Sequence, residues 1–174
     1  MEIYIVRHTS VAVQGICYGQ TDVPLKDTFE LEAEIVKNKL KSTPYDAVFS
    51  SPIGRCVKLA KYCGYEDNLQ LYDRLKELHF GDWEMQKWDE LDMKEWESDW
   101  VNNPTPNGES FMQMYNRITS FFDELKSKDY QSVLIFTHGG VINCARVYFG
   151  QTTLKSAFDK LADYGEILHF KLDS

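Results

Sequence analysis

Three features are missing from this 174-residue chain: long apolar runs, clustered cysteines and an excess of basic residues. No segment approaches the ~20 consecutive apolar residues of a membrane-spanning helix. Acidic residues outnumber basic ones, 27 to 19, and the formal charge of −8 argues against nucleic acid and against an anionic membrane as partners. The sequence shows no secretory leader pattern at its start, so we expect a cytoplasmic protein.

The four cysteines stand alone, since none belongs to a Cys-x-x-Cys pair. They are Cys17, Cys56, Cys63 and Cys144. Isolated cysteines give little support to a zinc site, and in a reducing compartment the default is a free thiol buried as a small apolar group. We therefore expect neither a metal ion nor a disulfide.

Strand-like and helix-like segments alternate along the chain. The strand candidates are Glu2–Val6, Asp46–Ser50, Asn68–Tyr72, Ser132–Thr137 and Ile167–Leu172, and the helix candidates are Phe29–Lys41, Pro52–Tyr62, Ser110–Lys126, Gly140–Phe149 and Leu154–Leu161. We place Ser51 at the N-cap of the second helix, and Ser110 and Gln113 in a capping box at the start of the third. This alternation predicts one α/β domain over residues 1–174, with three α/β/α layers around a mostly parallel central sheet.

Residues 81–109 depart from this alternation. They contain all four tryptophans, Trp83, Trp88, Trp96 and Trp100, together with many acidic residues and the turn-rich run NNPTPNGES. We expect a small helical insertion that its tryptophans hold together. The same segment is suited to cover a binding site, and the two interpretations are compatible.

Polar side chains that are costly to bury follow two of the apolar strands. Arg7 and His8 come directly after the run IYIV. The run SVLIFT is followed by His138, Gly139 and Gly140. Because ligands bind at the carboxyl ends of the strands in parallel α/β sheets, we expect these groups to share one crevice.

A third strand end adds a turn suited to an anion. The run SSPIGRC starts at Ser50 and should begin a helix, with Arg55 on its first turn. The N-terminus of a helix attracts anions, and arginine matches the geometry of a phosphate better than lysine does. Two arginines and two histidines in one crevice therefore predict a pocket for a phosphate group.

Glu77, in the run ELHFGDWE, is the predicted acid–base group. It follows a strand and a turn, so we expect it to reach the same crevice. Like-charge repulsion beside a phosphate dianion keeps a carboxyl protonated, and that form protonates a departing alkoxide. Asp82 and Glu84 lie close by, but position within the motif favours Glu77. We expect structural roles for His79 and His169.

Four motifs in this order, RHT, SSPxxRC, ELHFGDWE and THGG, resemble those of the histidine phosphatase (phosphoglycerate-mutase-like) superfamily. The resemblance spans nearly the whole chain. Three runs, CYGQTDVPL, HFGDWEM and NGES, are more similar to the α-ribazole phosphatase branch. Thr9 and Met85 fit that branch, where many other members have glycine. Gln14 stands where many members have asparagine, and it keeps the amide on a longer side chain.

The resemblance implies a two-step phosphatase reaction that needs no cofactor. His8 would be the nucleophile and form a phosphohistidine. Arg7, Arg55 and His138 would bind the phosphoryl oxygens, and Glu77 would protonate the leaving group.

The resemblance also implies a set of substrate-binding residues. Arg7, Arg55, His138 and the backbone of Gly139 would bind the phosphate, and Gln14, Tyr18, Gly19, Gln20 and Thr21 would line the pocket for the alcohol. The alternative for the last set is an ordinary turn that ends near Pro24.

The activity implied by the closer branch is hydrolysis of α-ribazole 5′-phosphate in the assembly of the cobalamin nucleotide loop. A phosphatase of broader specificity for sugar phosphates or other small metabolites fits the motifs equally well, because the motifs describe phosphate chemistry and leave the alcohol open. A mutase is disfavoured, because a short chain has little length with which to enclose the intermediate. The complete set of candidate residues argues against a third alternative, an inactive module that only binds phosphorylated ligands.

Overall fold

The computed structural model describes residues 1–173, which form a central sheet with helices on both of its faces. The strands are β1 (Glu2–Arg7), β2 (Ala47–Ser50), β3 (Leu69–Leu71), β4 (Ser132–Thr137) and β5 (Ile167–Lys171). The helices are α1 (Phe29–Leu40), α2 (Gly54–Tyr62), α3 (Lys94–Ser98), α4 (Phe111–Leu125) and α5 (Gly139–Tyr148), with short 3-10 turns at Glu66–Asn68, Asp73–Leu75, Gly81–Trp83 and Trp88–Glu90. None of the helices in this part of the chain has the length and apolar character needed to cross a bilayer.

The sheet has the strand order β3-β2-β4-β1-β5. Neighbouring strands from β3 to β1 run parallel, and β5 pairs antiparallel with β1. This confirms the predicted, mostly parallel sheet.

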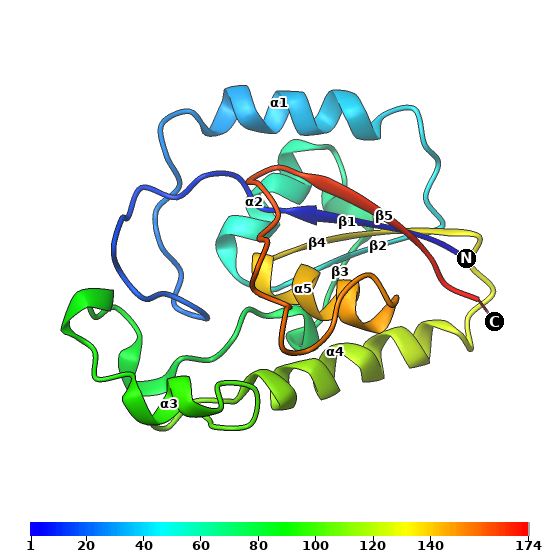
Figure 1. Cartoon of the computed structure of the whole chain (residues 1–174). Coiled ribbons are helices and arrows are strands. Elements are labelled where there is room, and N and C mark those ends of the chain that lie inside the picture. The colour runs from blue at the N-terminus through cyan, green and yellow to red at the C-terminus, as the bar shows by residue number, and fades with distance from the viewer. Residues whose placement is uncertain (174) are drawn as a thin grey trace.

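Alternate residues of the strands point to opposite faces of the sheet and build two separate cores. On one face Ile3 and Ile5 pack with the apolar stripes of α4 and α5. On the other face Val6 packs with α1 and α2. Figure 1 shows α1 above the sheet and α4 and α5 below it, which confirms the three-layer α/β/α class.

The start of α4 follows the predicted capping box. The Ser110 hydroxyl accepts a hydrogen bond from the Gln113 N–H at 3.2 Å, and the Gln113 side-chain oxygen accepts one from the Ser110 N–H at 2.8 Å. Both bonds satisfy backbone donors that the first turn of a helix leaves free.

The helix predicted from Pro52 begins two residues later, at Gly54, and Ser51 is not its N-cap. Ser51 continues the sheet instead, because its N–H donates to the carbonyl of Phe136 at 2.9 Å. Its hydroxyl lies 2.8 Å from Nε2 of His138. The prediction of Ser51 as the N-cap was wrong, because its side chain contacts His138, the residue that follows β4.

The helix predicted over Leu154–Leu161 is absent, and this prediction was wrong. Residues 151–163 form a series of bends and turns, in which N–H groups such as that of Asp159 reach back only three residues, to Ser156. The apolar spacing that suggested a helix serves another purpose, since Phe158 and Leu161 line a cavity.

The insertion at 81–109 contains α3 and two 3-10 turns, in line with the small helical segment expected there. Trp83 is buried and packs edge-on against Trp96, with ring centroids 5.8 Å apart. Trp100 packs on Phe111 of α4 at 5.4 Å. The tryptophans therefore hold the insertion together and attach it to the main body. All four cysteines of the chain are buried free thiols.

Candidate active site

The strand register brings the predicted polar groups to one edge of the sheet. Arg7 at the end of β1 is level with Thr137 at the end of β4, and Ser50 of β2 is level with Phe136. The residues that follow these strand ends therefore meet at the carboxyl edge, where open α/β sheets bind ligands.

His8 is 2% exposed and its ring is oriented by the backbone. Nδ1 lies 2.8 Å from the carbonyl of Thr9, so Nδ1 carries the proton and Nε2 keeps its lone pair. Burial, followed by the charges of Arg55 and Arg7, lowers the pKa of His8 from 6.5 to about 3. The imidazole is therefore neutral at physiological pH, which is the form that can act as a nucleophile.

Arg55 lies behind His8, fully buried, and donates from Nε to His8 Nε2 at 3.3 Å. Backbone carbonyls hold its other nitrogens, with Nη1 2.8 Å from the oxygen of Thr21 and Nη2 bonded to the oxygen of Gly19. Asp22 lies 3.5 Å away and offsets part of the charge. The loop at 19–22 thus fixes the guanidinium beside the imidazole.

Arg7 crosses the mouth of the site. Its Nη1 donates to the carbonyl of Ala162, and its guanidinium stacks on the ring of Tyr164, 4.0 Å from the ring centroid. Among the described residues its buried Nε has no partner. Gly139 leaves room beside it, since a Cβ there would lie 3.3 Å from Nε. An unsatisfied buried N–H of a cation is a donor that a bound anion would use.

His138 is fully buried at the start of α5, with Nε2 2.8 Å from the hydroxyl of Ser51. Its ring centroid lies 5.3 Å from that of His8. Burial, followed by the charges of Arg55 and His8, holds the pKa of His138 well below its usual range. In the free protein it therefore contributes hydrogen-bonding capacity, and the arginines carry the positive charge.

Glu77 enters the site from the loop after β3. Its carboxylate accepts from the N–H of Gly140 at 3.1 Å and of Leu78 at 3.0 Å. A side chain at 140 would displace the carboxylate of Glu77, since a Cβ there would lie 2.2 Å from Glu77 Oε1. Arg117 supports the loop by donating to the carbonyls of Lys76 and Glu77 at 2.7 and 2.9 Å.

Arg117 was missed by the sequence analysis, although a signal was present. It falls on the apolar stripe of the predicted helix Ser110–Lys126, between Met114 and Phe121, where a charged side chain needs a reason. Arg117 is needed there because it binds the carbonyls of Lys76 and Glu77 and forms a half-buried ion pair with Glu109.

Glu84 and Asp82, the alternatives to Glu77, have other partners. Glu84 accepts from the N–H groups of Gly19 and Gln20, each at 2.9 Å. Asp82 accepts from the side chain of Asn107 at 2.8 Å. Of the three carboxylates, only Glu77 lines the cavity described next.

A cavity of about 480 Å³ opens beside His8. Its polar end carries Arg7, His8, Glu77 and the backbone of Gly139 and Gly140, and the rest is lined by Ile16, Tyr18, Leu78, Phe80, Trp88, Trp96, Phe158, Leu161 and Tyr164. Trp88 and Trp96 come from the insertion at 81–109, so this segment forms one wall of the cavity. The site thus combines a small cationic pocket with a larger aromatic chamber.

The structure separates the five residues predicted to line the pocket for the alcohol, and Thr21, whose carbonyl binds Arg55, lies outside the cavity. Tyr18 lines the cavity. Gly19 and Gln20 do not, because the carbonyl of Gly19 binds Arg55 and the amide of Gln20 donates to the carbonyl of Glu77 at 3.1 Å. Gln14 is exposed and lies outside the cavity, beside Gly15, so the structure does not bring it to the other predicted site residues.

Tyr164 is a second residue that the sequence analysis missed, and no motif marks it. Its hydroxyl lies 3.0 Å from that of Tyr18, and its ring lies 5.6 Å from that of His8. Tyr18 in turn lies over Arg55, 5.2 Å from ring centroid to guanidinium. The two tyrosines therefore connect Arg7, which stacks on Tyr164, with the buried Arg55 beneath Tyr18.

Acid should destabilise the free protein through His8. The folded chain holds this imidazole neutral down to a pKa of about 3, while the unfolded chain takes up the proton near 6.5. The unfolding free energy should therefore fall as the pH drops from 6.5 to 3, by up to about 5 kcal/mol from His8 alone. Urea unfolding across this range measures the slope. We expect a shallower slope for His8→Asn; a slope equal to that of the unaltered protein would contradict the prediction.

The arginines and histidines at the carboxyl edge of the sheet form a pocket suited to a phosphate group. The family match agrees with a protein of this kind, one that acts on phosphate esters. The profile of the histidine phosphatase superfamily (branch 1) matches residues 3–174, and the chain belongs to this superfamily.

Individual relatives carry several activities in their names. The adenosylcobalamin/α-ribazole phosphatase of Salmonella typhimurium is 30% identical over 154 residues, covering 82% of this chain and 76% of the relative. Phosphoserine phosphatase 1 of Hydrogenobacter thermophilus is 26% identical over 150 residues, covering 79% and 71%. The crystal structure of the α-ribazole phosphatase from Shigella flexneri superposes with a TM-score of 0.89 over 99% of this chain and 91% of that one, at 24% identity.

Proposed function

We propose that this chain is a phosphomonoesterase that hydrolyses α-ribazole 5′-phosphate through a phosphohistidine on His8. The observation that carries the proposal is the aromatic chamber next to His8. α-Ribazole presents a flat benzimidazole base on a ribose, and rings such as those of Phe80, Trp88 and Trp96 are suited to pack against such a base.

The same chamber disfavours a small acidic substrate. Phosphoserine and phosphoglycerate carry a carboxylate besides the phosphate, and a carboxylate needs a cation or several N–H donors. Among the described residues that line the cavity, Arg7 is the only cationic side chain, and the phosphate would use it. A broad sugar phosphatase is the second candidate, and the aromatic lining is the feature that ranks it below the first.

The contacts of each group support a two-step reaction. Nε2 of His8 attacks phosphorus, and the bond from phosphorus to the ester oxygen breaks as Glu77 delivers a proton to that oxygen. Water then attacks the phosphohistidine, Glu77 takes a proton from it, and inorganic phosphate leaves. Arg7 and Arg55 stabilise the negative charge of the transferring phosphoryl group, with His138 as a further hydrogen-bond partner.

A substrate panel tests the proposal. It contains α-ribazole 5′-phosphate, phosphoserine, 3-phosphoglycerate and common sugar phosphates, and kcat/KM is measured for each. We expect α-ribazole 5′-phosphate to exceed the others. A higher value for phosphoserine or a sugar phosphate would refute the substrate, faster interconversion of phosphoglycerates than hydrolysis would indicate a mutase, and no turnover on any ester would indicate a binding module.

Removing one wall of the aromatic chamber should affect substrates unequally. Trp88→Leu deletes a ring that packs edge-on against Phe80, with centroids 5.4 Å apart. We expect kcat/KM for α-ribazole 5′-phosphate to fall about tenfold, since one aromatic contact contributes roughly 1 kcal/mol or more. Activity on inorganic pyrophosphate or a small alkyl phosphate should change less than threefold. Tyr62→Leu is the matched control, because Tyr62 lies at the end of α2, outside the cavity; equal losses in both variants would count against a role for the chamber.

A further inference from the structure

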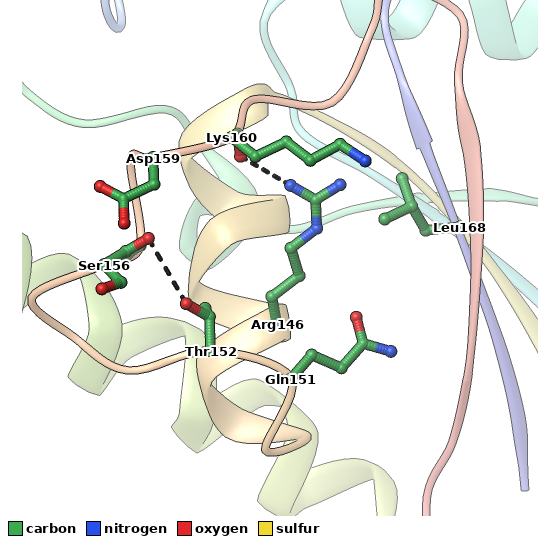
Figure 2. A pocket seen from close by; sticks show the side chains of 8 residues that line it. Arg146, Gln151, Thr152, Ser156, Asp159, Lys160 and Leu168 are labelled. Carbon is green, nitrogen blue, oxygen red and sulfur yellow. Dashed lines mark hydrogen bonds between the residues drawn. The ribbon is translucent and has the colours of Figure 1, made fainter.

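A second cavity, of about 340 Å³, lies at the carboxyl end of α5 beneath the turns at 151–160. It is lined by Arg146, Gln151, Thr152, Ser156, Ala157, Asp159, Lys160 and Leu168 (Figure 2). It shares no residue with the cavity beside His8.

Arg146 is the unusual feature of this cavity. Arg146 is only 9% exposed. Its Nη1 donates to the carbonyl of Lys160 at 2.7 Å and to Oδ1 of Asn143 at 3.4 Å. Both acceptors are neutral. Within residues 1–173 no carboxylate lies within 4.0 Å of its guanidinium. A cation this deeply buried is costly without an anionic partner, and the carboxyl end of α5 offsets only part of that cost.

The other groups around the cavity suit an anion. Figure 2 shows the amine of Lys160 and the guanidinium of Arg146 extending to the same side, toward Leu168. Gln151 adds a neutral donor, whereas the hydroxyl of Thr152 donates to the carbonyl of Ser156 at 3.4 Å. Asp159 is the one acid in the lining, and Figure 2 shows its carboxylate on the other side, pointing away from Arg146. The lining therefore carries a net positive charge on a chain whose formal charge is −8.

We propose that this cavity binds a small oxyanion, the phosphate or carboxylate group of a metabolite. The planar guanidinium of Arg146 would take two oxygens, and Lys160 would supply the second charge. A volume of about 340 Å³ has room for a phosphate or a short carboxylic acid.

The turns above the cavity connect it with the active site. Lys160 lines the second cavity, whereas Phe158 and Leu161 line the first. Arg146 holds the carbonyl of Lys160, and Arg7 holds the carbonyl of Ala162 two residues later. An oxyanion on Arg146 would therefore steady the segment 158–164, which forms one wall of the active-site cavity.

An amide chemical-shift titration with inorganic phosphate tests the binding, and it needs no turnover. We expect two separate groups of perturbed amides, one around His8 and Gly139 and one over 151–160. Arg146→Gln should weaken phosphate binding at the second group about tenfold or more and leave the first group unchanged. Loss of one charge-assisted pair of hydrogen bonds predicts this size of effect.

Two matched lysine variants distinguish binding at this cavity from a general effect of surface charge on phosphate. Lys160→Gln and Lys155→Gln remove the same charge from exposed positions, and Lys155 lies outside the cavity. We expect only Lys160→Gln to weaken the second group, by about threefold or more. A single group of perturbations in the unaltered protein, or equal losses in the two lysine variants, would overturn the proposal.

Two further measurements complete the test. A titration with acetate in place of phosphate shows which oxyanion the site prefers. If neither anion binds, the proposal of an oxyanion site is overturned. Hydrogen exchange of the amides of residues 158–164 should slow when the second site fills, and this slowing should be lost in Arg146→Gln. An exchange rate that is the same in both proteins at saturating anion would refute the link to the active site.

Discussion

Replacing His8 by alanine is expected to lower the rate of phosphate release by about 10⁴-fold or more, the size of loss seen when an enzyme loses its nucleophile. The position of His8 explains the size. Nδ1 is occupied by the Thr9 carbonyl, which directs the lone pair of Nε2 to the side where Arg55 lies. Within residues 1–173, no other side chain at the polar end of the cavity offers an unprotonated nitrogen, and His138 is engaged with the hydroxyl of Ser51.

Two measurements distinguish loss of the nucleophile from loss of the fold. Brief incubation with a ³²P-labelled ester followed by denaturation should trap acid-labile, base-stable phosphate on the unaltered protein and none on His8→Ala. His169→Ala is the control, since this histidine is exposed on β5 and pairs with Glu2. Full labelling of His8→Ala, or the same loss of activity in His169→Ala, would remove His8 from its proposed role.

The site residues that could be predicted from the sequence are those that lie at, or directly after, the end of a strand. The apolar run of β1 stops at Arg7, and parallel pairing with β4 makes Arg7 and Thr137 level. A residue that directly follows the end of such a strand therefore lies at the carboxyl edge of the sheet. This is why motif order and α/β topology were enough to bring Arg7, His8 and His138 together before any contact was known.

The parts that the sequence did not predict depend on contacts between distant segments. The apolar spacing of Leu154–Leu161 fits a helix, yet Phe158 and Leu161 line the active-site cavity, and the carbonyl of Lys160 accepts from Arg146, which lies on α5. Contacts with distant segments override the local preference for a helix and leave no trace in the local sequence. Tyr164 was missed for the same reason, because its value to the site arises only where it meets Tyr18 and Arg7.

Glu77→Gln should slow the first turnover of alkyl phosphates by about 10²- to 10⁴-fold, the usual contribution of a positioned general acid. A poor leaving group such as a ribose 5′-oxygen needs a proton as the bond to phosphorus breaks, and glutamine cannot give one. For 4-nitrophenyl phosphate the leaving group is stable as an anion, so the first turnover should slow less than about tenfold. Glutamine keeps the size of the side chain and accepts a hydrogen bond, as Glu77 does from Gly140.

The second step of the reaction gives this prediction a separate signature. Hydrolysis of the phosphohistidine still needs a base for the attacking water, so the variant should release a burst of 4-nitrophenol equal to the enzyme concentration and then turn over slowly. Rapid-mixing absorbance resolves the burst from the steady phase. Asp82→Asn is the matched control, because Asp82 is exposed and outside the cavity. Equal slowing of alkyl and aryl esters in the first turnover would show that Glu77 positions the substrate without transferring a proton, and the acid would then have to be sought elsewhere in the cavity.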